Sequence, residues 1–246
     1  MNYLFLQIFV AFCVFTTLAI IPDYLHVCKQ NDVNISKCIN NSINHLRVRF
    51  PEGIKELDVP PMEPMKLSEI TLKIGPPSAA ILCNITNLKV WKPSTFVITE
   101  LIPNLTTNTF FFKVWLPELH FKGHYDLKIH FYLINKKARG PVDGNFTNYH
   151  AEILMKGAKI IKNNEEYLNF DKVQLKLEIG KSKIRLENLF HNDALLKQFS
   201  DDLINDNPEI FVNEIKPTLE TALAEMFTEI ANKIALKFKY KELFPQ

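Results

Sequence analysis

The residues of this sequence that could do chemistry gather between Leu119 and Leu133. Histidines stand at three even-numbered positions of this segment, His120, His124 and His130, and imidazole is a common zinc ligand in proteins. Two of their spacings are too wide for one ion on a flat strand, and lysines stand between them. We therefore interpret these side chains as a solvated face and predict no metal site.

The odd-numbered positions of the same segment form an apolar face. They carry large apolar residues apart from Gly123, and the phenol of Tyr125 is the one polar tip among them. A buried phenol needs a hydrogen-bond partner. Two kinds of partner fit: an epoxide, ester or quinone oxygen of a lipophilic guest, or a backbone group or water molecule.

Known catalytic motifs are absent from the sequence. It contains no G-x-S-x-G, no H-E-x-x-H and no glycine loop for phosphate, and only 7 of its 246 residues are glycine. The formal net charge is +2, with lysine and glutamate interspersed, unlike a nucleic-acid-binding surface or a polybasic membrane patch. We predict no cofactor, no nucleic-acid partner and no enzyme, and keep a lipid-processing enzyme with dispersed catalytic residues as the alternative.

The first nineteen residues are expected to direct secretion. Residues 1–19 are largely apolar and end in Thr17-Leu18-Ala19, a pattern suited to signal peptidase, which makes Ile20 the expected mature start. A retained membrane anchor is the alternative, because no lysine or arginine precedes the apolar stretch. No other segment approaches the ~20 apolar residues that span a bilayer. We expect an extracellular protein without stable membrane insertion, in which residues 20–246 have a size that fits one large or two small domains.

Cysteines and glycosylation motifs fit this route. Cys28 and Cys38 are the natural disulfide pair, while Cys83 stands at strand spacing with Ile81 and Ile85 and is predicted to be a buried free thiol. Five N-x-[ST] motifs make glycosylation candidates of Asn34, Asn40, Asn84, Asn104 and Asn145.

Most of the chain has the period of β-strands. From Ile70 to Ile179 apolar and polar residues alternate in successive segments, including Phe110–Leu116 and Leu119–Leu133, with a loop expected over Lys136–Gly144. At ~3.3 Å per residue the strand Leu119–Leu133 would reach about 50 Å. A sheet this long with one apolar face needs a cover.

The helical period occurs at the two ends of the mature chain. A first helix is predicted from about Ile35 to Phe50, ended by Pro51, and the prolines of Leu57–Met65 favour an extended segment. Apolar residues recur three and four apart over 192–203 and again over 207–238, where Pro217 either kinks or restarts the helix. About 30 residues of helix would reach about 45 Å, which matches the long strand. We predict an α+β fold: a long, highly curved antiparallel sheet wrapped around one long C-terminal helix.

Several separate blocks carry a family resemblance. They are Cys28 with Cys38-Ile39, Gly53-Ile-Lys-Glu-Leu-Asp-Val-Pro-Pro-Met-Glu-Pro-Met65, Leu116-Pro-Glu-Leu119 with Gly123-His-Tyr125, Gly140-Pro-Val-Asp-Gly-Asn-Phe146, Glu187-Asn-Leu-Phe190 and Glu242-Leu-Phe-Pro245. In this order and spacing the chain resembles the insect takeout and juvenile hormone binding protein family. The single predicted disulfide resembles the takeout branch. Asn207-Pro208 departs from the family's usual Asn-Trp, and Val90-Trp-Lys-Pro93 departs from its usual glycine turn.

The resemblance implies a secreted, single-domain TULIP-like superroll. Such a fold encloses a hydrophobic tunnel along the helix and binds juvenile hormone or other lipophilic molecules without chemistry. We therefore expect a monomeric carrier or scavenger whose partner is a lipophilic small molecule. The alternative is an extracellular signalling protein linked to feeding or daily rhythm.

The tunnel should be lined by inward residues of the sheet and the last helix. The candidates are Phe110, Phe112, Val114, Phe121, Tyr125, Leu127, Phe131, Met226, Phe227, Ile230 and Ile234. Each residue alone is more readily explained as ordinary core. As a set they favour a binding site, because a sheet and helix this elongated rarely fill their whole axis with side chains.

Overall fold

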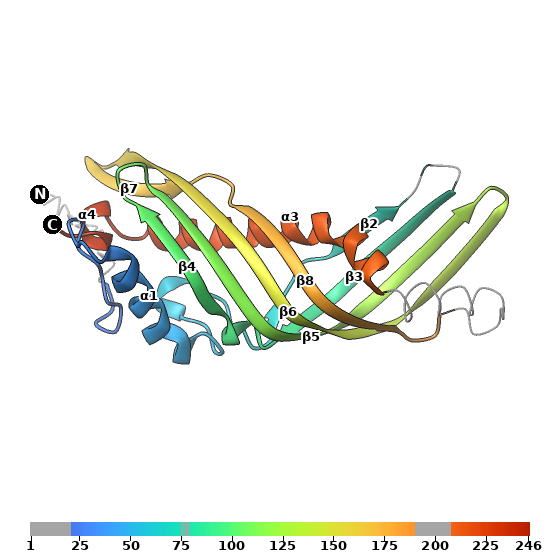
Figure 1. The fold of residues 1–246 in the computed structure, drawn as a ribbon. Helices are drawn as coiled ribbons and strands as arrows, with labels where there is room; N and C mark the ends of the chain where they lie inside the picture. Colours follow the sequence, from blue (N-terminus) through green and yellow to red (C-terminus); the bar gives the residue numbers. More distant parts are fainter. Residues whose placement is uncertain (1–20, 75, 77–78, 190–207) are drawn as a thin grey trace, which may run out of the picture.

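The computed structural model describes residues 21–74, 76, 79–189 and 208–246. Figure 1 shows an elongated molecule in which a large sheet runs beside one long helix, with the first described segment (blue) and the C-terminal α4 at the same end. The predicted signal peptide, residues 1–19, and the helix predicted over 192–203 lie outside the described residues.

Antiparallel pairing joins all the strands of the described chain, as predicted. The path of paired neighbours runs β1-β3-β5-β6-β7, while β2 pairs with β3, β4 with β5 and β8 with β6. The strands are β1 (Met65–Lys66), β2 (Ile70–Ile74), β3 (Ala79–Trp91), β4 (Val97–Asn104), β5 (Thr109–Phe131), β6 (Ile134–Lys162), β7 (Glu165–Phe170) and β8 (Gln174–Leu186).

Strand β5 joins two segments that the sequence suggested were separate. It runs unbroken through Pro117 for 23 residues. On one side of β5 the neighbouring strand changes near Pro117. Pairing with β4 extends along β5 as far as Trp115, which pairs with Val97, and pairing with β3 starts at His120, which pairs with Trp91. Neither strand pairs with β5 at Pro117, so the missing N–H breaks no ladder on that side.

A line of interruptions crosses the sheet at this point. The β5–β6 ladder skips the pair Pro117 and Asn148, and the β6–β8 ladder skips Asn148 and Gly180. Asn148 has φ 54°, and a Cβ on Gly180 would lie 2.9 Å from the Asn148 carbonyl oxygen. Interrupted pairing with glycine at the closest approach is typical of places where a sheet bends.

The prediction of a loop over Lys136–Gly144 is wrong, because these residues lie inside β6. The chain turns earlier, at Tyr132 and Leu133, and β6 pairs with β5 from Phe131↔Ile134 onward. Gly144 lies opposite Phe121, and a Cβ on it would lie 2.6 Å from Phe121 Cζ and would overlap the Lys183 carbonyl oxygen. The glycine at position 144 therefore reflects close packing and does not indicate a loop. The pattern also missed β7, which follows a turn at Asn163 and Asn164 with positive φ at both.

The helices agree with the sequence more closely. Helix α1 spans Ile35–Leu46 and continues into the 3₁₀ turn Arg47–Arg49, as predicted. Helix α3 spans Pro208–Ala235 with Pro217 inside it, so this proline does not restart the helix. Shorter helical segments are η2 (Lys55–Leu57), η3 (Pro93–Thr95) and α4 (Tyr240–Leu243).

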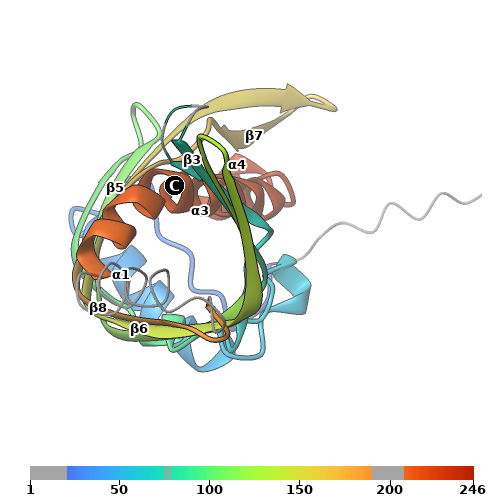
Figure 2. The same cartoon turned by 90° about the vertical axis from the view of Figure 1, so that its right-hand side faces the viewer.

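Helix α3 lies along one edge of the sheet, beside β8 and the segment that precedes β8. Three of its side chains bond to backbone groups there: Glu220 Oε1 accepts from Leu177 N (2.8 Å) and Thr228 Oγ1 from Val173 N (2.9 Å). Asn232 both accepts from Phe170 N (2.7 Å) and donates to its carbonyl (2.9 Å). An otherwise exposed strand edge is thereby satisfied. Figure 2 shows the strands curling around beside α3, so the fold is the predicted α+β wrap.

Candidate functional site: apolar cavities along helix α3

Three neighbouring cavities lie along α3: two lie mainly between the helix and the inner face of the sheet, and the third is also lined by α1 and the segment before it. Cavity A has a volume of about 80 Å³ and lies against Ile215 and Leu219. Cavity B, of about 370 Å³, lies against Phe227 and Ile230, and cavity C, of about 310 Å³, against Ala235. Their order follows the helix, and Ile215 to Ala235 corresponds to about 30 Å at 1.5 Å per residue.

Shared side chains connect the three cavities into one row. Leu119, Tyr149 and Leu223 line both A and B. Phe112 and Ile234 line both B and C. The three cavities are therefore adjacent and together form one row along α3.

The lining of cavities A and B is largely apolar because of two sequence periods. Alternate residues of β5, β6 and β8 point to the inner face of the sheet, and α3 presents residues three and four apart. Leu223, Phe227 and Ile230 show that spacing on the helix. Chemically, such a surface binds by removing apolar groups from water.

The structure places most of the proposed lining residues on this row. Phe112, Val114, Phe227, Ile230 and Ile234 line cavity B, Phe121 lines cavity A and Phe110 lines cavity C. Contact with a ligand stays a prediction for each of them.

The remaining candidates do not line the three cavities. Tyr125, Leu127 and Met226 are absent from all three linings, although Tyr125 and Leu127 are buried in the same core as the cavities and Met226 packs against it. The side chain of Phe131 lies outside the described part of the structure.

Tyr125 makes a bond within the protein. Its side chain is 2 % exposed, and its hydroxyl donates to the Glu187 carbonyl oxygen at 2.6 Å. Burial, with a smaller contribution from Cys83, raises the pKa of Tyr125 to about 12. Of the two partners that the sequence left open, the structure has the backbone group.

A different tyrosine stands on the cavity row. Tyr149 on β6 lines cavities A and B and is 4 % exposed. Within the described residues its hydroxyl has no hydrogen-bond partner. Burial, and then the Glu220 carboxylate, raise the pKa of Tyr149, so the phenol stays protonated and can donate.

The sequence contained a signal for this residue. Tyr149, Ala151, Ile153 and Met155 alternate as an apolar strand face, and all four line cavity B. Sequence reasoning singled out Tyr125 because it lies on the most regular strand, whereas the pairing that brings β6 beside it is not visible in one strand's pattern.

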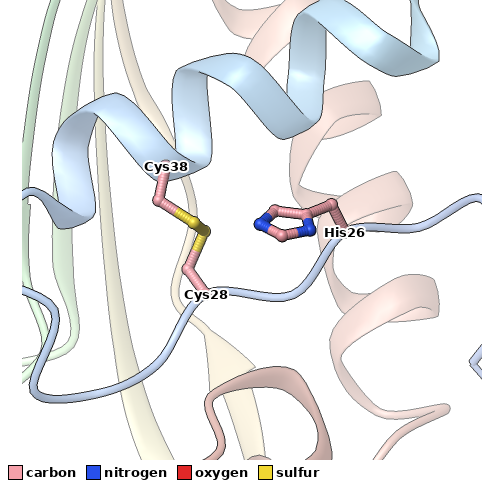
Figure 3. A group of neighbouring side chains, drawn as sticks. All are labelled: His26, Cys28 and Cys38. Carbon is pink, nitrogen blue, oxygen red and sulfur yellow. A yellow bond between two sulfur atoms is a disulfide. The ribbon is translucent and has the colours of Figure 1, made fainter.

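The predicted disulfide is present. Cys28 and Cys38 are joined, with Sγ–Sγ 1.99 Å and Cα–Cα 5.9 Å, and tie the N-terminal segment to α1 (Figure 3). His26 lies close to both sulfurs, within 4.8 Å in ligand-atom distance. Because the two sulfurs are bonded to each other, neither is available as a thiolate ligand for a metal.

The other chemistry-bearing residues have structural surroundings. Cys83 is a free, buried thiol as predicted, and burial, followed by the Asp126 charge, raises its pKa to about 11. His120 and His130 lie on the sheet face away from the cavities, and their Nδ1 atoms are 2.6 Å from Asn145 Oδ1 and 2.7 Å from Asn135 Oδ1.

Glycosylation stays a prediction at all five motifs. Asn34 is exposed before α1 and Asn40 lies within it. Asn104 holds a turn by accepting from Thr106 N and Thr107 N. Asn145 Oδ1 faces His120, and Asn84 on β3 has an enclosed Oδ1 without a partner.

Within the described residues, no helix combines the length and the apolar character needed to cross a bilayer.

Comparison with known proteins is consistent with this geometry. The chain is 21% identical over 231 residues to the circadian clock-controlled protein daywake of Drosophila melanogaster, covering 91% of this chain and 88% of that protein. The crystal structure of Takeout 1 from Epiphyas postvittana superimposes with a TM-score of 0.71 at 17% identity, covering 90% of this chain and 100% of that one. The model of the haemolymph juvenile hormone binding protein family matches residues 7–245, so the chain belongs to this family.

Proposed function

We propose that this protein is a secreted carrier or scavenger of a small lipophilic ligand, held without catalysis in cavities A to C. The observation that carries the proposal is the Tyr149 hydroxyl, which has no hydrogen-bond partner within the described residues, in cavities A and B, whose other lining side chains are apolar. Ligand sites are typically pockets of about 300–1,000 Å³ with a mostly apolar lining and a few polar groups that fix the orientation of the ligand. Cavities B and C each fall in this range.

The shape of the row indicates the class of ligand. A narrow row of about 30 Å fits a long terpenoid or fatty-acyl chain better than a compact ring system. The Tyr149 hydroxyl donates, so it favours a ligand with an ester, epoxide or other acceptor oxygen near the boundary of cavities A and B. Juvenile hormone, named in the family description, belongs to this class.

The driving force would be apolar burial. Removing ligand surface from water contributes about 25 cal/mol per Å² before the cost of association is deducted. In this proposal residues 1–19 are removed during secretion, and residues 20–246 form the single binding domain.

Filling the row tests the proposal. Ala231 lines both cavity B and cavity C, so Ala231→Phe should obstruct the row at its middle and lower the affinity for a long-chain terpenoid ester at least tenfold. Displacement of an apolar fluorescent probe measures this. The matched control is Leu236→Phe, on an exposed position just after the same helix, which should bind as the parent does. Equal affinity of both variants would contradict the proposal.

A further inference from the structure

Apolar side chains are exposed at hairpin turns at the two ends of the sheet. In the β5–β6 hairpin, Leu133 is 97 % and Tyr132 is 68 % exposed. In the β6–β7 hairpin, Ile161 is 78 % exposed and Ile160 is partly exposed. Figure 1 shows the β5–β6 hairpin projecting at one end of the molecule and β7 at the other. What differs between the two hairpins is the charge around them.

The β6–β7 hairpin has carboxylates among its lysines. Lys159 pairs with Glu166 at 2.9 Å. Glu165 at the start of β7 pairs with Lys239 at 2.8 Å and with Lys241 at 2.9 Å. Part of the positive charge at this end is therefore neutralised by carboxylates of the same chain.

The β5–β6 hairpin carries unbalanced positive charge. The ladders place Lys73 of β2 opposite Leu82 of β3, Leu82 opposite Lys128 of β5, and Lys128 opposite Lys137 of β6. The three lysines thus form one row across four strands, and all are exposed. Leu127 beside Lys128 is buried, so the row lies on the outer face of the sheet.

No carboxylate within the described residues neutralises this row. None of its three lysines has an ion-pair partner there, and the nearest acidic residue in the register, Asp126, stands opposite Arg139 in the next row. Lys128 directly opposite Lys137 is a repulsive cross-strand pair. An anion bound at the row would relieve that repulsion.

We propose that the β5–β6 end of the sheet docks on a bilayer that contains anionic phospholipid. A bilayer offers both features in the right order, with a negatively charged surface above an apolar layer. Leu133 enters the interface, and Lys73, Lys128 and Lys137 contact phosphate groups. Docking is peripheral and reversible, and no segment spans the membrane.

The inference goes beyond carriage, because it says where the ligand is exchanged. Along β5, cavity A, lined by Phe121, is the one of the three cavities nearest to the hairpin turn. Docking therefore directs that end of the cavity row toward the membrane. The sequence showed no basic run because the three lysines come from three different strands.

Co-sedimentation with vesicles tests the docking surface. The secreted, ligand-free protein should bind vesicles of phosphatidylcholine with phosphatidylserine, bind phosphatidylcholine alone weakly, and lose binding as salt rises. Lys128→Gln and Lys137→Gln should each weaken binding about fivefold, and Leu133→Ser about tenfold. Ile161→Ser, at the β6–β7 hairpin, where Glu165 and Glu166 pair with lysines, is the matched control and should bind as the parent does.

A second readout reports on insertion itself. Leu133→Trp should shift its emission to the blue with phosphatidylserine vesicles and not with phosphatidylcholine vesicles. The substituted positions are exposed, so folding should be retained and a thermal melt should show it.

The outcomes separate this proposal from the proposed function. Failure to bind anionic vesicles, equal binding of both vesicle types, or equal losses in Leu133→Ser and Ile161→Ser would overturn docking while terpenoid binding stayed intact. Binding of an acidic protein but not of vesicles would also overturn it. Vesicle binding with loss of all terpenoid binding would instead overturn carriage.

Discussion

Two buried tyrosines on paired strands use their hydroxyls differently. Tyr125 donates to the Glu187 carbonyl, so its bond holds β5 to the segment after β8. Tyr149 is buried to a similar extent, but its hydroxyl has no hydrogen-bond partner within the described residues. Its side chain lines two cavities. The first hydroxyl therefore serves the fold, and the second is available to a guest.

Removing each hydroxyl should separate these roles. We expect Tyr149→Phe to weaken binding of a terpenoid ester about two- to tenfold, which corresponds to the loss of one hydrogen bond. Binding of the matching hydrocarbon and the free energy of unfolding should not change. Tyr125→Phe should do the reverse, with stability lower by about 1–3 kcal/mol because the Glu187 carbonyl is left unpaired. Urea titration and ligand titration of both variants measure the two effects. Swapped effects would contradict the assignment.

Cys83 should make the protein less stable in mild alkali. Its pKa is raised to about 11 in the fold, from an ordinary value of 9.0. Between these values the unfolded chain releases the thiol proton while the folded chain keeps it, so stability falls as pH rises. The free energy of unfolding should drop by about 1–1.5 kcal/mol from pH 8 to pH 10 through this group.

Cys83→Ala is the control for that pH dependence. The variant should lack this part of the drop, as measured by urea unfolding at several pH values. A thiol reagent at pH 8 should label no cysteine in the folded protein and one in the unfolded protein. Rapid labelling of the folded protein would show that the thiol is not buried.

At the scale of elements, glycine decides how closely β6 approaches its neighbours. A Cβ on Gly144 would meet the Phe121 ring and the Lys183 carbonyl, whereas one on Gly123 would meet the Thr86 carbonyl at 3.1 Å and needs only a small shift. We expect Gly144→Ala to destabilise by about 1–3 kcal/mol and Gly123→Ala by clearly less. Urea unfolding of the pair checks this order, and an equal cost would contradict the packing argument.

The same glycine explains a failure of the sequence prediction. Lys136–Gly144 has the glycine, proline and charge content of a loop, yet it forms one strand of a long hairpin. The two glycines of this segment lie opposite Phe121 and Tyr125 of β5. The sequence of the segment alone does not reveal these cross-strand partners. The single strand β5 across Pro117 was also not visible in the sequence pattern, because the proline lies where the neighbour of β5 changes from β4 to β3.

Other elements could be predicted because their cause is local. The first helix, the disulfide and the last helix follow from apolar spacing, cysteine proximity and a proline at the first turn. The inward residues of β5 and α3 were predictable for the same reason. The choice between Tyr125 and Tyr149 was not, because it depends on the Glu187 carbonyl, which the chain brings to Tyr125 from 62 residues away.

At the scale of the whole molecule, length is the property that connects sheet, helix and cavities. The long strands need a cover of similar length, α3 supplies it, and its polar side chains satisfy backbone groups at the sheet edge. Cavities A to C lie along this contact, in the order in which α3 passes the sheet.

Native mass spectrometry of the secreted, deglycosylated protein tests the central claim most directly. The account predicts one lipophilic molecule per chain, released by organic solvent, identified as a terpenoid or fatty-acyl compound, and reduced or absent in Ala231→Phe but not in Leu236→Phe. A protein that is empty, and that also rejects terpenoids and fatty acids supplied in excess, would contradict it.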